Sequence, residues 1–242
     1  MDFKKIVTFS FDDGVTQDVR FIEILNKYGL KCTFNLNSEL LGKEGSLNVQ
    51  GKKINHTKVA PELVKDIYKG HEVASHTLTH PNLTTLSPAE VVRQVETDRK
   101  NLSELVGYDV CGFAYPCGGI NCNRAVADLI KTKTNVKYAR TIIHSHNFDV
   151  PNDLFLFKPT ASLTKDKKVF FKHCLDFVNA TPDKLQLFYI WGHSYELDVD
   201  DSWDYFENVC KMFSLNKDIY FCTNTEAFEY IKSFGENITK KS

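Results

Sequence analysis

The chain has 242 residues, of which 42% are hydrophobic and 25% are charged, and its formal net charge at pH 7 is −1. A chain of this size and composition can fold as one α/β barrel, so we expect a single domain over residues 1–242. The near-zero charge and the lack of basic runs exclude the broad positive surface that binds nucleic acid or an anionic membrane.

Short apolar runs alternate with amphipathic segments along the chain, which predicts strands alternating with helices. The first half is expected to contain, in order, strand 6–11, helix 16–28, strand 32–37, a loop with room for a small hairpin at 39–57, helix 61–68, strand 72–75 and helix 87–106. The second half is expected to contain strand 112–115, helix 124–132, strand 138–141, helix 167–179, strand 185–191, helix 202–215, strand 219–222 and helix 225–234. Segment 142–163 has little periodicity. This alternation predicts a parallel sheet.

The helix at 87–106 has the clearest boundary signals. Ser87 is a typical N-cap, Pro88 suits the first helical position, and Glu90 is placed as the partner in a capping box. Gly107 is expected to end the helix.

The cysteines and the N-terminus both bear on the compartment. The seven cysteines are an odd number and form no C-x-x-C pair, so free thiols are expected. Only a few apolar residues precede Asp12, which is not the pattern of a signal peptide, and no apolar stretch approaches the roughly 20 residues of a membrane span. The sequence therefore predicts a cytoplasmic protein.

The first motif is Phe-Asp-Asp-Gly at the end of strand 6–11. Asp12 and Asp13 repel each other there, and a divalent cation bound to one of them would offset that cost. Side chains diverge along a strand, so one carboxylate can be a ligand and the other a nearby base. Gly14 permits the tight turn that follows. The structural alternative is a helix N-terminus, where acidic residues stabilise the helix dipole.

The second motif places His76 and His80 four residues apart. On a helical turn such a pair shares one face and suits a single metal, although a coincidence of surface histidines is the simpler alternative. With Asp13 the pair completes an Asp/His/His set. That set leaves coordination positions open for water and substrate, as a catalytic metal requires.

Two later strands end in residues that suit acyl transfer. Strand 112–115 enters a rigid Pro-Cys-Gly-Gly turn, in which the backbone N–H of Cys117 could face a developing oxyanion. Strand 185–191 delivers His193, whose ordinary pKa suits a general acid. The alternatives are a turn without function and a structural histidine.

Together these motifs resemble the polysaccharide deacetylase superfamily, also known as the NodB homology or carbohydrate esterase family 4 group. The ordered features are F-D-D-G, H-T-x-x-H, a strand with a proline turn and a late strand ending in histidine. They span Val7 to about Cys222, nearly the whole chain. The resemblance implies a distorted (β/α) barrel of seven or eight strands and the removal of N-acetyl or O-acetyl groups from a carbohydrate.

The resemblance also implies roles for individual residues. Asp13, His76 and His80 would bind a divalent metal, zinc above all, with Co²⁺, Ni²⁺ and Mn²⁺ as the other options. Asp12 would be the general base, and His193 would be the general acid.

Three positions depart from the family pattern. Cys117 stands where the family usually has a tyrosine, although a backbone donor survives that change. Ala114 fills the place of an arginine that orients the base, and Arg140, at the end of strand 138–141, is the candidate substitute. The aspartate that usually pairs with the acid histidine has no clear counterpart. The candidates for it are Glu196, Asp198 and Asp149.

Other residues carry weaker signals. Tyr115 and Trp191 are candidates to stack on a sugar ring, although core packing is the commoner use of aromatic residues. His144 and His146 form either a second metal site or, more simply, part of a loop. A nucleophilic Cys117 is disfavoured because the spacing suggests no Cys–His pair.

Three function classes remain open at this point. The favoured one is a deacetylase acting on an acetylated sugar or oligosaccharide. The others are a hydrolase of another C–N bond, such as a cyclic amide, and a non-catalytic carbohydrate-binding protein on the same fold. The sequence specifies neither the glycan nor the oligomeric state.

Overall fold

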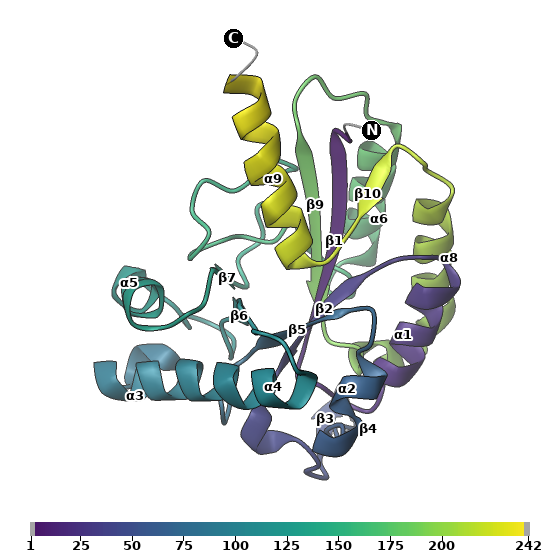
Figure 1. The fold of residues 1–242 in the computed structure, drawn as a ribbon. Coiled ribbons are helices and arrows are strands. Elements are labelled where there is room, and N and C mark those ends of the chain that lie inside the picture. Colours follow the sequence, from purple (N-terminus) through teal and green to yellow (C-terminus); the bar gives the residue numbers. More distant parts are fainter. Residues whose placement is uncertain (1–2, 240–242) are drawn as a thin grey trace.

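In the computed structural model, which describes residues 3–239, a curled parallel sheet forms the centre of the molecule (Figure 1). Within those residues the sheet has eight strands in the order β7-β6-β5-β2-β1-β9-β8, with β10 also paired to β1. The strands are β1 (Lys5–Asp12), β2 (Cys32–Leu36), β5 (Glu72–Ser75), β6 (Gly112–Ala114), β7 (Tyr138–Arg140), β8 (Ala161–Ser162), β9 (Gln186–Gly192) and β10 (Ile219–Phe221). The parallel sheet predicted from the sequence is therefore confirmed.

Strand β1 is the centre of this arrangement. Along one edge it pairs with β9, and along the other it pairs first with β10 and then with β2. Every residue of β1 is buried, because both faces of the strand are covered. The strand that ends at the two aspartates is thus held on both edges and on both faces.

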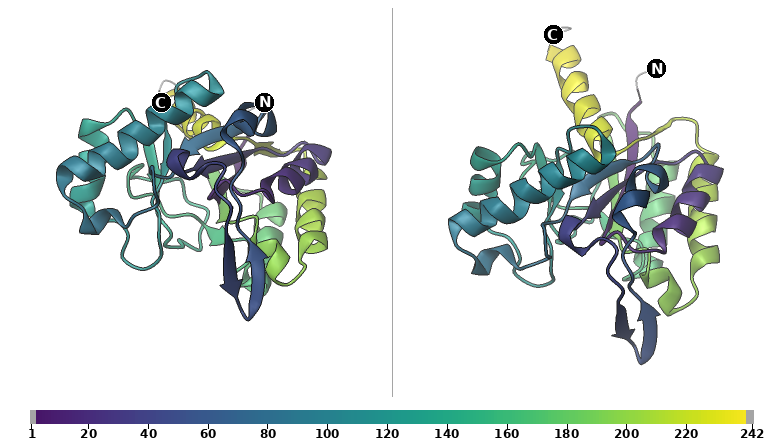
Figure 2. Two further views of the ribbon diagram at one scale, coloured as in Figure 1. Left: turned by 90° about the horizontal axis from the view of Figure 1, so that it is seen from below. Right: turned by 60° about the horizontal axis from the view of Figure 1, so that its bottom comes forward.

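Helices surround the sheet, as Figures 1 and 2 show from three directions. They are α1 (Asp18–Lys27), α2 (Val64–Ile67), α3 (Pro88–Val92), α4 (Asp98–Val106), α5 (Arg124–Lys133), α6 (Lys167–Asn179), α7 (Glu196–Val199), α8 (Trp203–Ser214) and α9 (Asn224–Thr239). Single 3₁₀ turns occur at η1 (Ser38–Leu40), η2 (Pro61–Leu63) and η3 (Leu83–Thr85). No helix within residues 3–239 is long and apolar enough to cross a bilayer.

The helix expected at 87–106 is continuous, but its hydrogen-bonding pattern changes in the middle. Between α3 and α4 it contains a π-helical stretch, η4 (Arg93–Thr97). Ser87 caps it by accepting a hydrogen bond from the Glu90 N–H, and Gly107 ends it at φ +81°. The predicted capping box is wrong, because the Glu90 carboxylate accepts hydrogen bonds from Arg93 instead of from the backbone N–H of Ser87.

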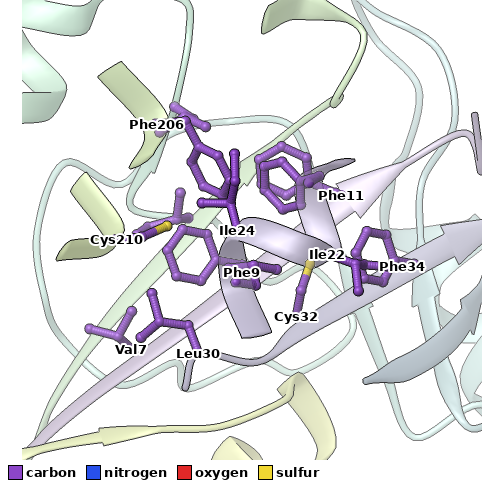
Figure 3. Packing of buried hydrophobic residues seen from close by; sticks show 14 of the residues in the cluster. Val7, Phe9, Phe11, Ile22, Ile24, Leu30, Cys32, Phe34, Phe206 and Cys210 are labelled. Atoms are coloured by element: carbon purple, nitrogen blue, oxygen red, sulfur yellow. The ribbon is translucent and has the colours of Figure 1, made fainter. Parts of the chain in front are cut away.

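Aromatic side chains fill the space between β1 and the helices on one side of it. Phe9 and Phe11 of β1 lie near Phe206 of α8 in this cluster (Figure 3). Phe21 of α1 contacts Phe11 and stacks on Phe206, with ring centroids 4.1 Å apart in both pairs. Phe34 of β2 joins them edge-on. Replacing one such phenylalanine by alanine typically costs about 3–5 kcal/mol, so this cluster contributes strongly to the stability of the packing around β1.

Two segments complete the architecture around the site. The hairpin expected within 39–57 is present as β3 (Ser46–Val49) and β4 (Lys52–Asn55), and it projects from the body of the molecule (Figure 2). The aperiodic segment 142–163 is irregular except for the short strand β8 at its end, and its backbone is hydrogen-bonded to the strands on both sides. The Thr141 N–H donates to the Phe157 carbonyl, and the Thr160 N–H donates to the Tyr189 carbonyl of β9. This segment therefore bridges the gap between β7 and β9.

Candidate active site

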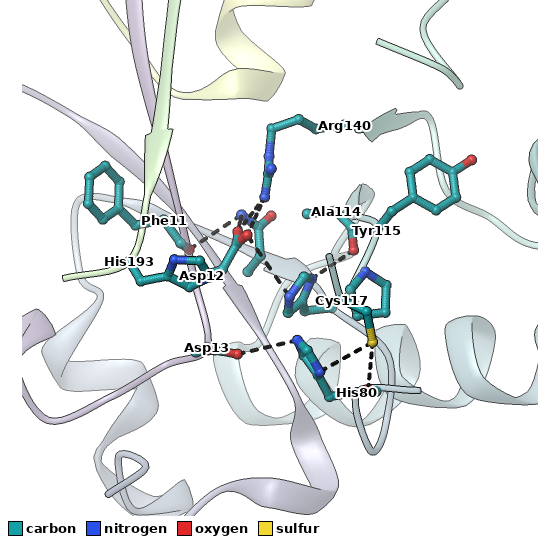
Figure 4. A network of polar contacts seen from close by, with 12 residues as sticks. Phe11, Asp12, Asp13, His80, Ala114, Tyr115, Cys117, Arg140 and His193 are labelled. Carbon is teal, nitrogen blue, oxygen red and sulfur yellow. Dashed lines mark hydrogen bonds and ion pairs between the residues drawn. The ribbon is translucent and has the colours of Figure 1, made fainter. Parts of the chain in front are cut away.

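The residues singled out from the sequence meet at one end of the sheet. Asp12 ends β1, His76 follows β5, Arg140 ends β7 and His193 follows β9, so each lies at the carboxyl end of a strand. Parallel barrels gather their reactive groups at this face. Figure 4 shows Arg140, Asp12, Asp13, His80 and His193 pointing toward a common centre.

Asp12 is held by a buried arginine. Nη2 of Arg140 contacts both carboxylate oxygens, at 2.6 Å for Oδ2, and Asn35 donates to Oδ1 at 2.8 Å. The exposed fractions of the Arg140 and Asp12 side chains are 0% and 2%. Burial alone would raise the pKa of Asp12, but Arg140, His76 and His193 together lower it, so the carboxylate is ionised at neutral pH.

Asp13, His76 and His80 form a compact group of potential ligands. Their ligand atoms lie within 4.8 Å of one another, and they are the only three-residue group of this kind in the described part of the chain. Oδ1 of Asp13 is 3.7 Å from Nε2 of His80. Two ligand atoms each ~2.1 Å from a tetrahedral metal lie ~3.4 Å apart, so the observed spacing fits a shared cation.

The two imidazoles are prepared for metal binding by their other nitrogens and by burial. Nδ1 of His76 donates to the Ala114 carbonyl at 2.8 Å, which leaves Nε2 free to act as a ligand. Burial lowers the pKa of His76 to about 4 and also lowers that of His80. Both rings are therefore neutral at pH 7, the form that coordinates metal.

The helical turn inferred for His76 and His80 is absent. Thr77 and His80 have φ angles of +72° and +60°, so the chain passes through the left-handed region. Nδ2 of Asn37 fixes this turn by donating to the carbonyls of His76, at 2.5 Å, and Thr77, at 2.9 Å. The two imidazoles are still neighbours, with centroids 4.9 Å apart, but a stabilised loop brings them together rather than helical periodicity.

His193 has a carboxylate partner three positions further along the chain, at the start of α7. Its Nδ1 is 3.1 Å from Oε1 of Glu196, whose other oxygen contacts the Thr164 hydroxyl. Burial alone would lower the pKa of His193, but Glu196 and the two site aspartates raise it to about 9. The imidazole is therefore protonated at neutral pH. The other two candidates, Asp198 and Asp149, bond elsewhere: Asp198 to Gln17 and Trp203, and Asp149 to Lys184.

Cys117 lies in a turn with φ +70°, where its backbone N–H donates to no protein acceptor within residues 3–239. Its Sγ lies 3.4 Å from the His80 carbonyl and 3.8 Å from the His80 Nδ1. This Cys–His contact was not suggested by the spacing in the sequence. Burial and the nearby Asp13 raise the pKa of the thiol, so it is not a ready nucleophile.

Tyr115 and Trp191 line the cavity, but they are largely buried. Their exposed fractions are 0% and 4%. The Tyr115 hydroxyl donates to the Phe155 carbonyl, and the Trp191 indole N–H donates to Nε2 of His144. Stacking on a sugar requires an exposed ring face, so this role stays a prediction, and the observed contacts are those of cavity walls.

The cavity around these groups has a volume of about 510 Å³ and includes residues outside every sequence motif. His56 and Lys58, from the segment after β4, contact Asp13 at 3.1 Å and 3.5 Å. Tyr195 lies between His56 and His193, with ring centroids 5.0 Å from each. In the sequence, the only feature that could have pointed to His56 and Lys58 is that they are two residues apart, as neighbours on one side of an extended segment are.

The histidines at 144 and 146 do not form a second three-residue metal group in the described part of the chain. Nδ1 of His146 is 3.4 Å from Nε2 of His173, and His144 accepts from Trp191. The simpler interpretation, loop histidines, matches this geometry.

Known proteins resemble the chain in sequence. A family model described as polysaccharide deacetylase matches residues 2–136, more than half of the chain. A peptidoglycan-N-acetylglucosamine deacetylase from Listeria monocytogenes is 30% identical over 120 residues, which cover 48% of this chain and 22% of that protein. The chain thus matches less than half the length of such curated relatives.

Solved structures resemble the chain in fold. A peptidoglycan deacetylase from Bacillus subtilis superposes with a TM-score of 0.59 at 19% identity, covering 98% of this chain and 96% of that one. A family 4 acetyl xylan esterase from Clostridium thermocellum, in complex with a cobalt ion, gives 0.57 at 15% identity over 93% and 91%. A family 4 pseudoenzyme from Bacillus anthracis gives 0.56 at 17% identity over 93% and 66%. These likenesses confirm the distorted barrel expected from the sequence.

Proposed function

The chain belongs to the polysaccharide deacetylase family, and we propose that it removes acetyl groups from a carbohydrate by metal-dependent hydrolysis, releasing acetate. One observation carries this proposal. The Asp13/His76/His80 group lies beside a second carboxylate, Asp12, which a buried arginine holds. A ligand set and a separate base are the two parts that hydrolysis of an amide with a metal-activated water requires.

Asp13, His76 and His80 would hold a divalent cation, zinc above all. Bound there, such a cation would supply Lewis-acid polarisation of the acyl carbonyl and a water of lowered pKa. The donor set of one carboxylate and two neutral imidazoles suits zinc and also cobalt, nickel or manganese. The cobalt ion in the Clostridium thermocellum esterase supports a site of this chemistry.

Asp12 is the proposed general base. Arg140 keeps its carboxylate ionised and fixes its orientation, so it can accept the proton of the attacking water. Arg140 thereby takes the place of the family arginine that is Ala114 here. The backbone N–H of Cys117, which has no acceptor among residues 3–239, is the proposed donor to the oxyanion, and one such donor is typically worth ~3 kcal/mol.

His193 is the proposed general acid. Glu196 raises its pKa to about 9, so the ring carries a proton at pH 7 and can give it to the leaving amine as the C–N bond breaks. Asp12 and His193 are therefore ionised in opposite senses at the same pH, as an acid–base pair requires. The products are acetate and a free amino sugar.

A direct assay tests this function. The protein is freed of metal with a chelator, reloaded with Zn²⁺ or Co²⁺, and incubated with chitooligosaccharides, acetylated xylan or small acetylated sugars while acetate is measured. We expect metal-dependent acetate release from at least one substrate and none from Asp13→Ala. Release that is equal with and without metal would contradict the proposal.

A non-catalytic carbohydrate-binding role is the second candidate. It is favoured by the pseudoenzyme among the fold neighbours, which shows that this fold can lack activity. It predicts metal and sugar binding without acetate release from any of the three substrate classes. A hydrolase of another C–N bond would instead act on a cyclic amide and leave the acetylated sugars intact.

A further inference from the structure

The metal ligand Asp13 has two further contacts that the proposed reaction does not use. Nε2 of His56 is 3.1 Å from its Oδ2, and Nζ of Lys58 is 3.5 Å from its Oδ1. Asp13 and Lys58 are buried, with exposed side-chain fractions of 9% and 6%. A lysine ammonium is seldom buried to this extent unless it is paired, so this contact is a built feature of the site.

The backbone fixes both residues against the turn that carries Asp13. Lys58 forms an antiparallel bridge with Val15, the Thr16 N–H donates to the Thr57 carbonyl, and the Val59 N–H donates to the Gly14 carbonyl. Residues two apart on an extended segment point to the same side. His56 and Lys58 therefore reach Asp13 together.

His56 and Lys58 contact different carboxylate oxygens of Asp13. A carboxylate can only accept, so His56 must donate to Oδ2, which turns Oδ1 toward the imidazoles. Oδ1 is the oxygen 3.7 Å from His80, and it is also the oxygen that Lys58 contacts. A metal held by Asp13 and His80 would therefore share Oδ1 with a lysine ammonium.

We propose that His56 and Lys58 set the metal affinity of this site in opposite directions. His56 is a positioning residue that presents Oδ1 to the metal. Lys58 is an internal counter-ion that neutralises the buried carboxylate when no metal is bound and that the metal must displace or repel. This inference rests on the metal site of the proposed function, but not on the identity of the substrate or on turnover.

The physical reason for opposite effects is charge. Without metal, a buried carboxylate needs a compensating cation, and Lys58 supplies it. With metal, two cations compete for one oxygen, and their repulsion weakens metal binding. Removing the ammonium should tighten metal binding and destabilise the metal-free protein. A purely structural lysine would not tighten metal binding when removed.

The test is a titration of the metal-free full chain with Zn²⁺, in which binding is measured by calorimetry or by competition with a chelating dye. We expect Lys58→Met to bind Zn²⁺ at least tenfold more tightly than wild type and to have a lower Tm without metal. Lys58→Arg keeps the charge and should bind as wild type does. If Lys58→Met does not fold, Lys58→Gln replaces it. Unchanged or weaker binding by the folded neutral variant would overturn the counter-ion role.

The His56 arm of the experiment has its own control. We expect His56→Phe, which keeps the ring volume but no donor, to bind Zn²⁺ at least tenfold more weakly. His56→Gln, whose Nε2 can replace the lost donor, should recover most of that loss. Equal affinity of His56→Phe and wild type would overturn the positioning role. Failure of the wild type to bind Zn²⁺ would instead reject the proposed function, while binding without acetate release would reject turnover alone.

Discussion

The buried ion pair between Arg140 and Asp12 allows a quantitative prediction. Arg140→Met keeps most of the side-chain volume but leaves an ionised carboxylate, 2% exposed, without its cation. Breaking a buried pair in this way typically costs about 3–5 kcal/mol of unfolding free energy. The matched control is Arg124→Met, because Arg124 and Asp153 form an exposed pair with side-chain exposures of 62% and 39%. Removing an exposed pair of this kind should cost less than about 1 kcal/mol.

The loss caused by Arg140→Met should depend on pH in a definite direction. In the wild type the pKa of Asp12 lies below its ordinary value of 3.8, so its contribution to stability is present above pH 3.8 and is lost as the pH falls through the lower folded value. In the variant burial is less opposed and the pKa of Asp12 rises. The carboxyl group can then take up a proton as the pH falls, which relieves the cost of the unpaired charge.

Urea denaturation of the wild type and both variants at about pH 8 and about pH 5 measures this effect. We expect the loss for Arg140→Met to be smaller at the lower pH, and the loss for Arg124→Met to be small at both. A loss for Arg140→Met below about 1 kcal/mol, or one that is equal at the two pH values, would refute the reasoning.

Three further predictions concern the chemistry of the site. Glu196→Gln removes the carboxylate that raises the pKa of His193 to about 9, so the alkaline limb of the pH profile of kcat/KM should move to lower pH. The control Asp198→Asn should leave that limb in place, because Asp198 bonds elsewhere. An unmoved limb in Glu196→Gln would exclude His193 as the acid. Cys117→Ala keeps the backbone N–H and should keep kcat within about tenfold of wild type, whereas a much larger loss would assign the role to the thiol. His80→Ala removes one ligand and should lower Zn²⁺ affinity in equilibrium dialysis by several orders of magnitude, and a wild-type affinity would place the metal elsewhere.

The central strand and the motifs at strand ends were predictable because both follow from local patterns. The apolar run before Asp12 and Asp13 is typical of a buried strand. In a parallel sheet the carboxyl ends of the strands lie at the same edge, so the motifs at those ends are brought together. That His76 and His80 lie side by side was predicted correctly, but from a helical turn that the structure does not contain. The positive φ angles of Thr77 and His80 depend on hydrogen bonds from Asn37, which no local pattern announces.

Contacts between distant segments set the limit of sequence reasoning. Arg140 lies 128 positions from Asp12, and only the missing family arginine drew attention to it. His56 and Lys58 reach Asp13 through the bridge between Val15 and Lys58, and a bridge of two isolated residues has no sequence signature. Segment 142–163 lacks periodicity because its conformation is set by hydrogen bonds to its neighbours on both sides.

A crystal of the full chain grown with Zn²⁺, with anomalous data collected at the zinc edge, tests the central claim most directly. The account predicts one strong peak about 2.0–2.2 Å from a carboxylate oxygen of Asp13 and from Nε2 of both His76 and His80. A peak bound instead by His146 and His173, or no peak at the Asp13 site under saturating Zn²⁺, would contradict it.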